Sequence, residues 1–451
     1  MTFKQTLVLL LLFFCFNSLK AQIYPDQNYV MRIDSLYNNI ETNSGIKLSD
    51  DGKNLMLEDN VIDGYVIFKP QYSQSPFNEG LPSWNGTAPD VNSGFRVQMR
   101  FPYNGSWSPW LTVGYWKTNI LGAYSKPSYG GGYIDYDNAK LYSYQSSWQF
   151  KVIMKRTSIN QPSPTINKLS FYVSDSRTTS NLNLTDIVND NPSGIFIPTN
   201  FIYQYDVDPG IGGDICSPTS VSMILRSYSI AVDPKQFALD NYDTNFGMFG
   251  IWPRVVQNAS EYGLDGEVNR YRTWSEAREV LANGGRISMS IGQPLYTGHL
   301  VMLAGFTSDG RPIVHDPAKS NGYSYVFNKS DLSQAWFNKG GVAYTFYLSN
   351  STTDVENNVN NNLANDFELF QNYPNPFNPS TTISLSLKNS GLTKLSVYDI
   401  LGREVQVLLN DELSAGNYKI NFDGQNLSSG IYIYRLESGS FIQSKRMILL
   451  K

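Results

Sequence analysis

Residues 212–225 read GGDICSPTSVSMIL and contain Cys216, on which the interpretation of the central part of the chain depends. Pro218 suits the first turn of a helix, and apolar residues follow it at helical spacing, so a helix should begin near the cysteine. A thiol at a helix N-terminus faces unpaired N–H groups and the positive end of the helix dipole, which lower its pKa. The stretch therefore predicts a reactive thiolate at Cys216; a small buried hydrophobic side chain is the alternative.

The start of the chain predicts export. Residues 1–21, MTFKQTLVLLLLFFCFNSLKA, combine an early lysine, an apolar run and a final small residue, as a signal peptide does. The run is too short for a membrane helix, and no other stretch reaches the roughly 18 to 20 apolar residues that one requires. Cys15 lies within the signal peptide, so Cys216 has no cysteine to pair with after cleavage. Because an unpaired thiol is a liability outside the cell, export favours a functional role for Cys216.

Charge and composition exclude several function classes. Removing Lys4 and Lys20 with the signal peptide changes the formal charge from −4 to −6, and a mildly acidic chain without basic clusters argues against nucleic acid as a partner. Two histidines and one thiol give no credible metal site. No glycine-rich loop precedes a helix as phosphate binding requires, so no cofactor is expected.

The two histidines, His299 and His315, both lie in one predicted hairpin, GHLVMLAGFTSDGRPIVHDPAKS (298–320). A thiol nucleophile needs an imidazole to take its proton, and that imidazole needs a partner such as Asp316 to fix its tautomer. If the Asp-Gly pair forms a two-residue turn, odd residues of the first strand face the same side as even residues of the second. His299 and Asp316 then share a face, which favours His299 as the base, whereas a three-residue loop would reverse the pattern.

Gln204, in FIYQYDVDPG, lies 12 residues before Cys216. Its amide could donate to an oxyanion that develops beside the helix N-terminus. A surface glutamine is the alternative.

The order Gln204, Cys216, His299 and Asp316 resembles that of papain-like cysteine peptidases. YQYDVDPGIGGDICSPTS and GHLVMLAGFTSDGRPIVHDPA are similar to the bacteriocin-processing (double-glycine) peptidase-like branch in its secreted, transporter-free form, and FGIWPRVVQNASEYGL and YVFNKSDLSQAW support this likeness. The resemblance implies an α+β papain-like domain over 196–349. It further implies that Cys216 is the nucleophile, His299 the general base, Asp316 the orienting residue and Gln204 the oxyanion donor.

This chain departs from the family at one position, because Ser217 stands where the family usually has glycine directly after the cysteine. A side chain there either crowds the oxyanion site or points away from it.

Residues 22–195 predict an antiparallel β-sandwich. Short runs rich in β-branched and aromatic residues, separated by Gly, Pro, Asn and Ser, carry this pattern: YVIFKP, FRVQMRF, WLTVGYW, WQFKVIMKR and LSFYVSD. The same domain contains Trp84, Trp107, Trp110 and Trp116. Core packing of these rings is favoured over a ligand platform, for which a cell-surface glycan or peptide is the candidate ligand.

The end of the chain predicts a linker and a small β domain. Residues 350–366, NSTTDVENNVNNNLAND, are polar and Asn-rich, which is typical of a linker. Residues 367–451 contain NYPNPFNPST and end in KRMILLK, and they resemble the C-terminal sorting domain of the type nine secretion system, an immunoglobulin-like module. A β-sandwich adhesion module is the alternative. The resemblance implies passage through the type nine secretion machinery and a secreted or outer-membrane-surface location.

The sequence thus predicts a multidomain protein with an N-terminal β-sandwich, a central papain-like domain and a C-terminal immunoglobulin-like sandwich. The predicted function is hydrolysis of peptide bonds in a peptide or protein substrate through a Cys-His-Asp site. Two alternatives stay open: a catalytically inactive papain-like protein that binds a peptide or glycan, and a thiol-dependent acyl transferase.

Overall fold

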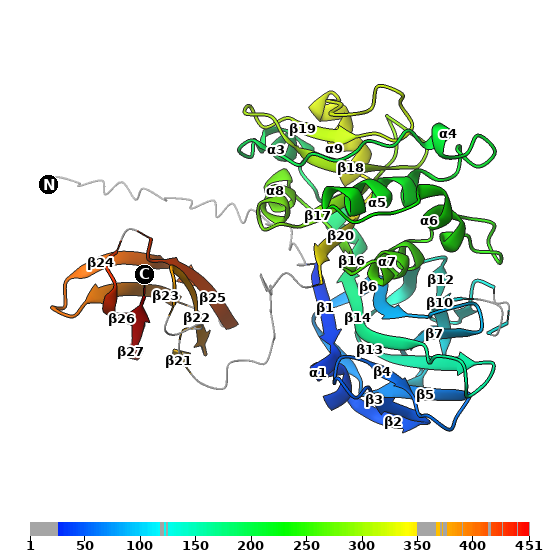
Figure 1. Cartoon of the computed structure of the whole chain (residues 1–451), viewed down its shortest axis with the longest axis horizontal. Coiled ribbons are helices and arrows are strands. Elements are labelled where there is room, and N and C mark those ends of the chain that lie inside the picture. The colour runs from blue at the N-terminus through cyan, green and yellow to red at the C-terminus, as the bar shows by residue number, and fades with distance from the viewer. Residues whose placement is uncertain are drawn as a thin grey trace, which may run out of the picture. The chain divides into compact units, whose positions relative to one another are not determined.

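The computed structural model describes residues 26–117, 121–122, 125–349, 367–369, 372, 377–389, 391–413, 416–425, 427–439 and 441–450. The expected signal peptide over 1–21 and the expected linker over 350–366 lie outside the described residues. The chain divides into two compact units, residues 1–351 and 352–451, and its secondary structure is mostly strand (Figure 1). The structure therefore confirms the prediction of a multidomain, β-rich chain.

The first unit begins with a large set of antiparallel strands and one short helix. These elements are β1 (Gln27–Arg32), α1 (Ile33–Asn38), β2 (Ile40–Ser44), β3 (Ile46–Leu48), β4 (Leu55–Leu57), β5 (Asp63–Phe68), β6 (Gln71–Thr87), β7 (Ser93–Arg100), β8 (Pro102–Tyr103), β9 (Ser106–Trp107), β10 (Leu111–Trp116), β11 (Ser128–Tyr129), β12 (Gly132–Asp135), β13 (Asn138–Arg156) and β14 (Thr165–Ser174). The five predicted runs overlap β5, β7, β10, β13 and β14, with differences of one or two residues at their ends. The sequence reading missed β6, because its proline, glycine and asparagine residues are typical of turns.

The long strand β13 joins two layers of this β region. Its residues 149–156 pair with β5 and β7, and its residues 139–148 pair with β6. The layers face each other across a buried core, in which Trp84 of β6 lies so close to Gly114 of β10 that a Cβ on the glycine would come within 2.3 Å of the indole. Hence only glycine fits at position 114.

Of the four tryptophans considered as a ligand platform, two lie in the core and two are partly exposed. Trp84 and Trp116 are fully buried. Trp107 and Trp110 are partly exposed, and the Arg100 guanidinium lies 5.2 and 4.4 Å from their ring centroids. Core packing therefore accounts for two of the four rings.

The rest of the first unit mixes helices with a second antiparallel sheet of strand order β15-β18-β17-β20-β16, to which β19 adds beside β18. The elements are α2 (Ser176–Ser180), α3 (Leu184–Asn189), β15 (Ile195–Phe196), α4 (Gln204–Val207), α5 (Cys216–Ser227), α6 (Pro234–Asn241), α7 (Trp252–Glu261), β16 (Leu264–Arg270), α8 (Trp274–Ala282), β17 (Arg286–Ile291), β18 (His299–Phe306), β19 (Pro312–His315), α9 (Lys329–Phe337) and β20 (Val342–Leu348). Helix α5 packs on β17 and β18, and α7 packs on β16. The predicted helices after Pro218 and through 252–263 and 274–285 are all present.

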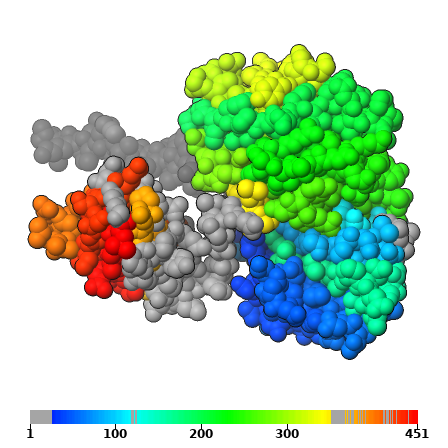
Figure 2. All heavy atoms as spheres, in the orientation of Figure 1, coloured from blue at the N-terminus to red at the C-terminus, as the bar shows by residue number. Residues whose placement is uncertain are grey.

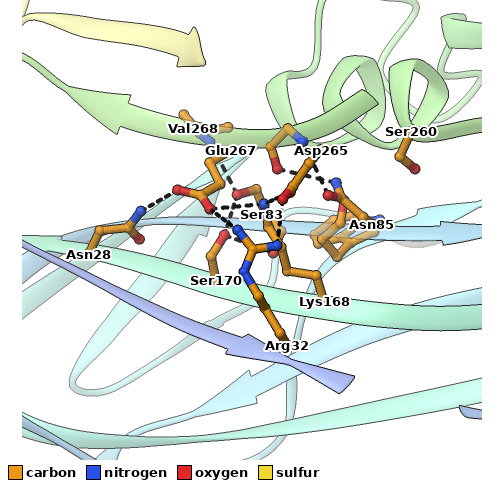
Figure 3. A network of polar contacts seen from close by, with 12 residues as sticks. Asn28, Arg32, Ser83, Asn85, Lys168, Ser170, Ser260, Asp265, Glu267 and Val268 are labelled. Carbon is orange, nitrogen blue, oxygen red and sulfur yellow. Dashed lines mark hydrogen bonds and ion pairs between the residues drawn. The ribbon is translucent and has the colours of Figure 1, made fainter. Parts of the chain in front are cut away.

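A buried ionic network joins the N-terminal strands to β16 (Figure 3). Lys168 of β14 is 2% exposed; its ammonium contacts Asp265 and lies 2.9 Å from a Glu267 carboxylate oxygen. Arg32 of β1 contacts the other oxygen of Asp265. In the space-filling view the N-terminal strands, blue to cyan, and the following residues, green, form one continuous body (Figure 2).

Hydrogen bonds from β6 to the backbone of β16 complete this interface. Asn85 donates to the Gly266 carbonyl at 3.2 Å and accepts from the Gly266 N–H at 3.1 Å. The Val268 N–H donates to the Ser83 hydroxyl at 3.1 Å. Such directional bonds to backbone groups fix the two parts of the first unit in one register.

Lys168→Met should lower the free energy of unfolding of the first unit by about 3 kcal/mol, because it leaves the partly buried carboxylates of Asp265 and Glu267 with Arg32 as their remaining cation. All eight tryptophans lie between residues 84 and 336, so urea denaturation followed by tryptophan fluorescence reports on this unit in the full mature chain. Lys47→Met, which breaks the surface pair with Asp59 (2.8 Å), is the matched control and should cost less than about 1 kcal/mol. Equal losses from both variants would show that the buried network contributes no more than a surface pair.

The second unit contains two small antiparallel sheets, of order β21-β22-β25 and β24-β23-β26-β27. Its strands are β21 (Glu368–Leu369), β22 (Ser380–Leu387), β23 (Gly391–Asp399), β24 (Glu404–Leu413), β25 (Gly416–Asp423), β26 (Gly430–Ser438) and β27 (Phe441–Leu449). Leu385, Val397, Tyr434 and Leu449 are among the buried residues of its own core. The five strands expected in this region are present. Strand β24 was not predicted, because its residues Asn410–Glu412 are polar.

Candidate active site

Cys216 is the first residue of α5, as its sequence context predicts. The N-cap residue, Ile215, makes no side-chain capping bond, so the thiol lies beside the N–H groups that open the helix. Burial by itself raises the pKa of the thiol, but hydrogen bonds from His299 and from the backbone N–H groups of Ser217 and Leu300 outweigh it and lower that pKa. Cys216 is nevertheless partly exposed, as a nucleophile must be.

His299 opens β18 and is 4% exposed. Its Nε2 lies 2.7 Å from Oδ1 of Asp316, which leaves Nδ1 as the ring nitrogen for the Cys216 thiol. Burial alone lowers the pKa of His299, but the hydrogen bonds with Asp316 and Cys216 raise it to about 9. Together with the lowered thiol pKa, this favours a thiolate–imidazolium pair at neutral pH.

Asp316 is fully buried immediately after β19. Burial tends to raise its pKa, yet hydrogen bonds from His299, from the Tyr296 hydroxyl at 2.6 Å and from the Ala318 N–H at 3.0 Å lower it. The Tyr296 ring also lies 4.3 Å from the His299 ring, centroid to centroid. The sequence reading missed Tyr296, although its position three residues before His299 was a usable signal.

The hairpin that joins His299 to Asp316 differs from the predicted one. Thr307 pairs with Arg311, so three residues and not two form the turn. A β-bulge between Leu303 and Gly305 then shifts the register by one residue, so that Met302 lies opposite His315. The two changes cancel, and His299 and Asp316 still share a face. The expected third strand, YSYVFN, is reduced to a single bridge between Val314 and Tyr325.

His315 has a structural environment and lies apart from the thiol. Its Nδ1 accepts from the Ser324 N–H at 3.1 Å, its Nε2 lies 3.3 Å from the Ile197 carbonyl, and its ring stacks on Tyr323 at 4.6 Å. Burial lowers the pKa of His315 to about 4, so the ring is neutral near pH 7.

Gln204 is 2% exposed and opens the short helix α4. One N–H of its amide donates to the Gly212 carbonyl at 2.5 Å, in the loop that leads to Cys216. Its backbone N–H donates to Pro317 at 2.9 Å, next to Asp316. Gln204 therefore bridges the segments that carry the nucleophile and the carboxylate, and its second amide N–H is available to another acceptor.

The Ser217 side chain is buried and turned toward β20. Its hydroxyl lies 2.8 Å from the Tyr344 hydroxyl, and its Cβ lies 3.2 Å from the position that a Cβ on Gly250 would take. The hydroxyl is thus held by Tyr344, while the Ser217 N–H still bonds the thiol.

Residues 196–344 match the Peptidase_C39 like family. This C39-like segment contains all four candidate residues, and its match suggests a cysteine peptidase. Residues 371–450 match the family described as the secretion system C-terminal sorting domain. Both resemblances found in the sequence are therefore confirmed.

The sorting domain indicates secretion or attachment at the outer-membrane surface, and it implies interaction with the secretion machinery. Among the described residues, no helix is both long and apolar enough to cross a membrane.

Among solved structures, two that resemble this chain are the following. One is PorZ, described as an essential bacterial surface component of the type-IX secretion system of Porphyromonas gingivalis, with 14% identity, a TM-score of 0.15 and coverage of 36% of this chain and 25% of PorZ. The other comprises the CBM51-2 and INT domains from Clostridium perfringens ZmpB, with 10% identity, a TM-score of 0.16 and coverage of 94% and 84%. At these TM-scores neither likeness carries an argument. No curated protein matches the chain significantly.

Proposed function

We propose that the protein is an exported cysteine peptidase that hydrolyses peptide bonds through Cys216, His299 and Asp316. The observation that carries the proposal is one imidazole held between a buried carboxylate, 2.7 Å from Nε2, and a thiol at a helix N-terminus. A cysteine nucleophile needs this arrangement, because the imidazole takes the thiol proton and the carboxylate fixes the ring's tautomer.

In the proposed reaction the Cys216 thiolate attacks the substrate carbonyl and forms a tetrahedral intermediate. The free amide N–H of Gln204 and the N–H groups at the start of α5 stabilise its oxyanion. The His299 imidazolium then protonates the leaving amine, which leaves a thioester on Cys216. His299, now neutral, takes a proton from water, and the hydroxide attacks the thioester and releases the carboxylic acid. The Cys216 thiolate and the His299 imidazolium are thereby restored.

The proposed domain layout assigns residues 22–195 to a β-sandwich, 196–349 to a papain-like peptidase domain and 367–451 to an immunoglobulin-like sorting domain. Separate cores around Trp84 and around Val301 support the first boundary. The first two domains lie in one compact unit, so they should act together.

An irreversible thiol-directed peptide inhibitor, followed by mass spectrometry of the mature protein, tests the proposed function together with a peptide-library cleavage assay. An adduct on Cys216 and hydrolysed peptides are expected. An adduct without cleavage would favour the peptide-binding protein, and products joined to an added amine would favour the acyl transferase. Cys216→Ser is the control for labelling at other sites.

A further inference from the structure

The turn between β12 and β13, in the N-terminal β region, places Asp137 at the start of α7. The Asp137 Oδ2 accepts from the Trp252 N–H at 3.0 Å. Beside it, the Tyr136 ring packs on Phe246 at 5.1 Å, and Tyr136 has φ +58°, a left-handed conformation that costs free energy in a residue other than glycine. The turn is therefore held against the C39-like segment in one strained geometry.

Lys339 reaches the same region from the residues that follow α9. Its aliphatic stem crosses two glycines: Cδ lies 3.5 Å from the position of a Cβ on Gly292, and Nζ lies 3.8 Å from that of Gly298, the residue before His299. The lysine therefore lies in van der Waals range of both glycine positions. Lys339 is exposed, and among the described residues its ammonium makes one long hydrogen bond, to the Ile291 carbonyl at 3.4 Å, and no ion pair.

Lys339 and Asp137 lie beside the two segments that carry the proposed catalytic pair. The Lys339 ammonium donates to Ile291, which lies opposite His299 in the β17–β18 pair, and Asp137 bonds Trp252, two residues after the Gly250 that lies against Ser217. Burial lowers the pKa of Lys339, whereas the charges of Cys216 and Asp137 oppose that effect. Burial raises the pKa of Asp137 to about 7. The charges of Asp137 and Cys216 also help to raise the pKa of the Tyr344 hydroxyl, which hydrogen-bonds Ser217. The charge of Asp135 contributes to the raised pKa of Asp137.

Figure 3 shows the contacts that join the N-terminal strands to β16, and Asp137, in the turn before β13, belongs to the same N-terminal region. Lys168, buried between Asp265 and Glu267, and the hydrogen bonds from β6 to β16 hold the strands on the C39-like segment. The hydrogen bond from the Trp252 N–H positions the Asp137 carboxylate on the C39-like segment, and a charge held in this way discriminates between charged substrates better than a mobile one does.

We propose that Lys339 and Asp137 form a charged subsite beside Cys216 that selects substrates with a carboxylate near the attacked carbonyl. Lys339 binds the carboxylate, and Asp137, supplied by the N-terminal β region, weakens that binding when it is ionised. The inference rests on the proposed function for its substrate class, a peptide with an acidic residue next to the scissile bond.

Alkylation of Cys216 tests the subsite without any turnover. Iodoacetate carries a carboxylate and iodoacetamide is its neutral analogue, so the ratio of their rates reports on a nearby anion site. In the full mature protein we expect this ratio to be several-fold higher at pH 5.5 than at pH 8. The pKa of Asp137, about 7, lies inside this interval, whereas His299, with a pKa of about 9, stays charged and His315, with a pKa of about 4, stays neutral.

Variants of the two residues give opposite expected shifts. Lys339→Met should lower the ratio at pH 5.5 by about tenfold, and Lys339→Arg should retain it. Asp137→Asn should keep the ratio high at both pH values. Lys53→Met and Asp59→Asn, at exposed loop positions of the N-terminal β region, are matched controls and should not change it. A ratio insensitive to Lys339→Met, or one lowered by Asp137→Asn, would overturn the subsite.

Matched peptides with Glu or Gln next to the scissile bond then separate this inference from the proposed function. Preferential cleavage of the Glu peptide, lost in Lys339→Met, supports both. Cleavage with no Glu preference overturns the subsite alone. Absence of cleavage together with the expected alkylation ratios overturns the peptidase function and leaves the anion subsite standing.

Discussion

His299→Ala will lower kcat/KM for peptide hydrolysis by about 10³- to 10⁴-fold, whereas His315→Ala will leave it near the wild-type value. The first substitution removes the proton carrier between the thiol and the leaving amine. The second removes a ring that bonds only Ser324 and Ile197, so it should lower the free energy of unfolding by about 1 to 3 kcal/mol instead. Asp316→Ala should lie between them, because it loosens the imidazole but does not remove it.

The shifted pKa values of Cys216 and His299 predict how kcat/KM of the wild-type protein depends on pH. Activity requires the His299 imidazolium, so kcat/KM should fall as pH rises through about 9. On the acid side it should fall only where the thiolate becomes protonated, below the usual range of a thiol because the pKa of Cys216 is lowered. In His299→Ala, alkylation of Cys216 should shift toward the roughly 8.5 of a free thiol.

Equal losses of activity from the two histidine substitutions would contradict the assignment of His299. So would a wild-type thiol that does not react below about pH 8.5. Circular dichroism of each variant controls for unfolding.

Gln204→Ala will lower kcat by about 10²-fold, because one donor to the oxyanion is lost. Alkylation of Cys216 by iodoacetamide should keep its rate and pH profile, since that reaction forms no oxyanion and the His299–Asp316 pair is unchanged. The comparison of kcat with alkylation therefore separates an oxyanion role from a general loss of structure.

Gln334→Ala, on α9, is the matched control and should leave both quantities unchanged. If Gln204→Ala slowed alkylation as much as turnover, loss of the side-chain bond to the Gly212 carbonyl would explain the result, and the oxyanion would depend on backbone N–H groups alone.

The sequence by itself predicted the candidate catalytic residues and the main elements of the C39-like segment. One cysteine after the expected signal peptide and two histidines in one hairpin leave few combinations, and Pro218 with the apolar residues after it favours a helix that starts at the thiol. These features are local, so backbone sterics and helical periodicity are enough to predict them.

The shared face of His299 and Asp316 was predicted from the wrong turn. Residues near the tip allow either a two- or a three-residue loop at similar free energy, and the bulge beside Ala304 depends on how β18 packs between β15, β17 and β19. Register in a sheet interior is therefore a property of the neighbouring strands.

Tertiary structure alone decided which distant residues meet at the thiol. Tyr296 bonds Asp316, Tyr344 holds Ser217, and Asp137 reaches α7 from a strand pair of the N-terminal region. No periodicity or motif links these positions, because each contact joins segments that are far apart in the sequence or lie in different secondary-structure elements. Long-range packing of this kind is a balance of burial, ion pairing and shape that becomes defined only when both surfaces have folded.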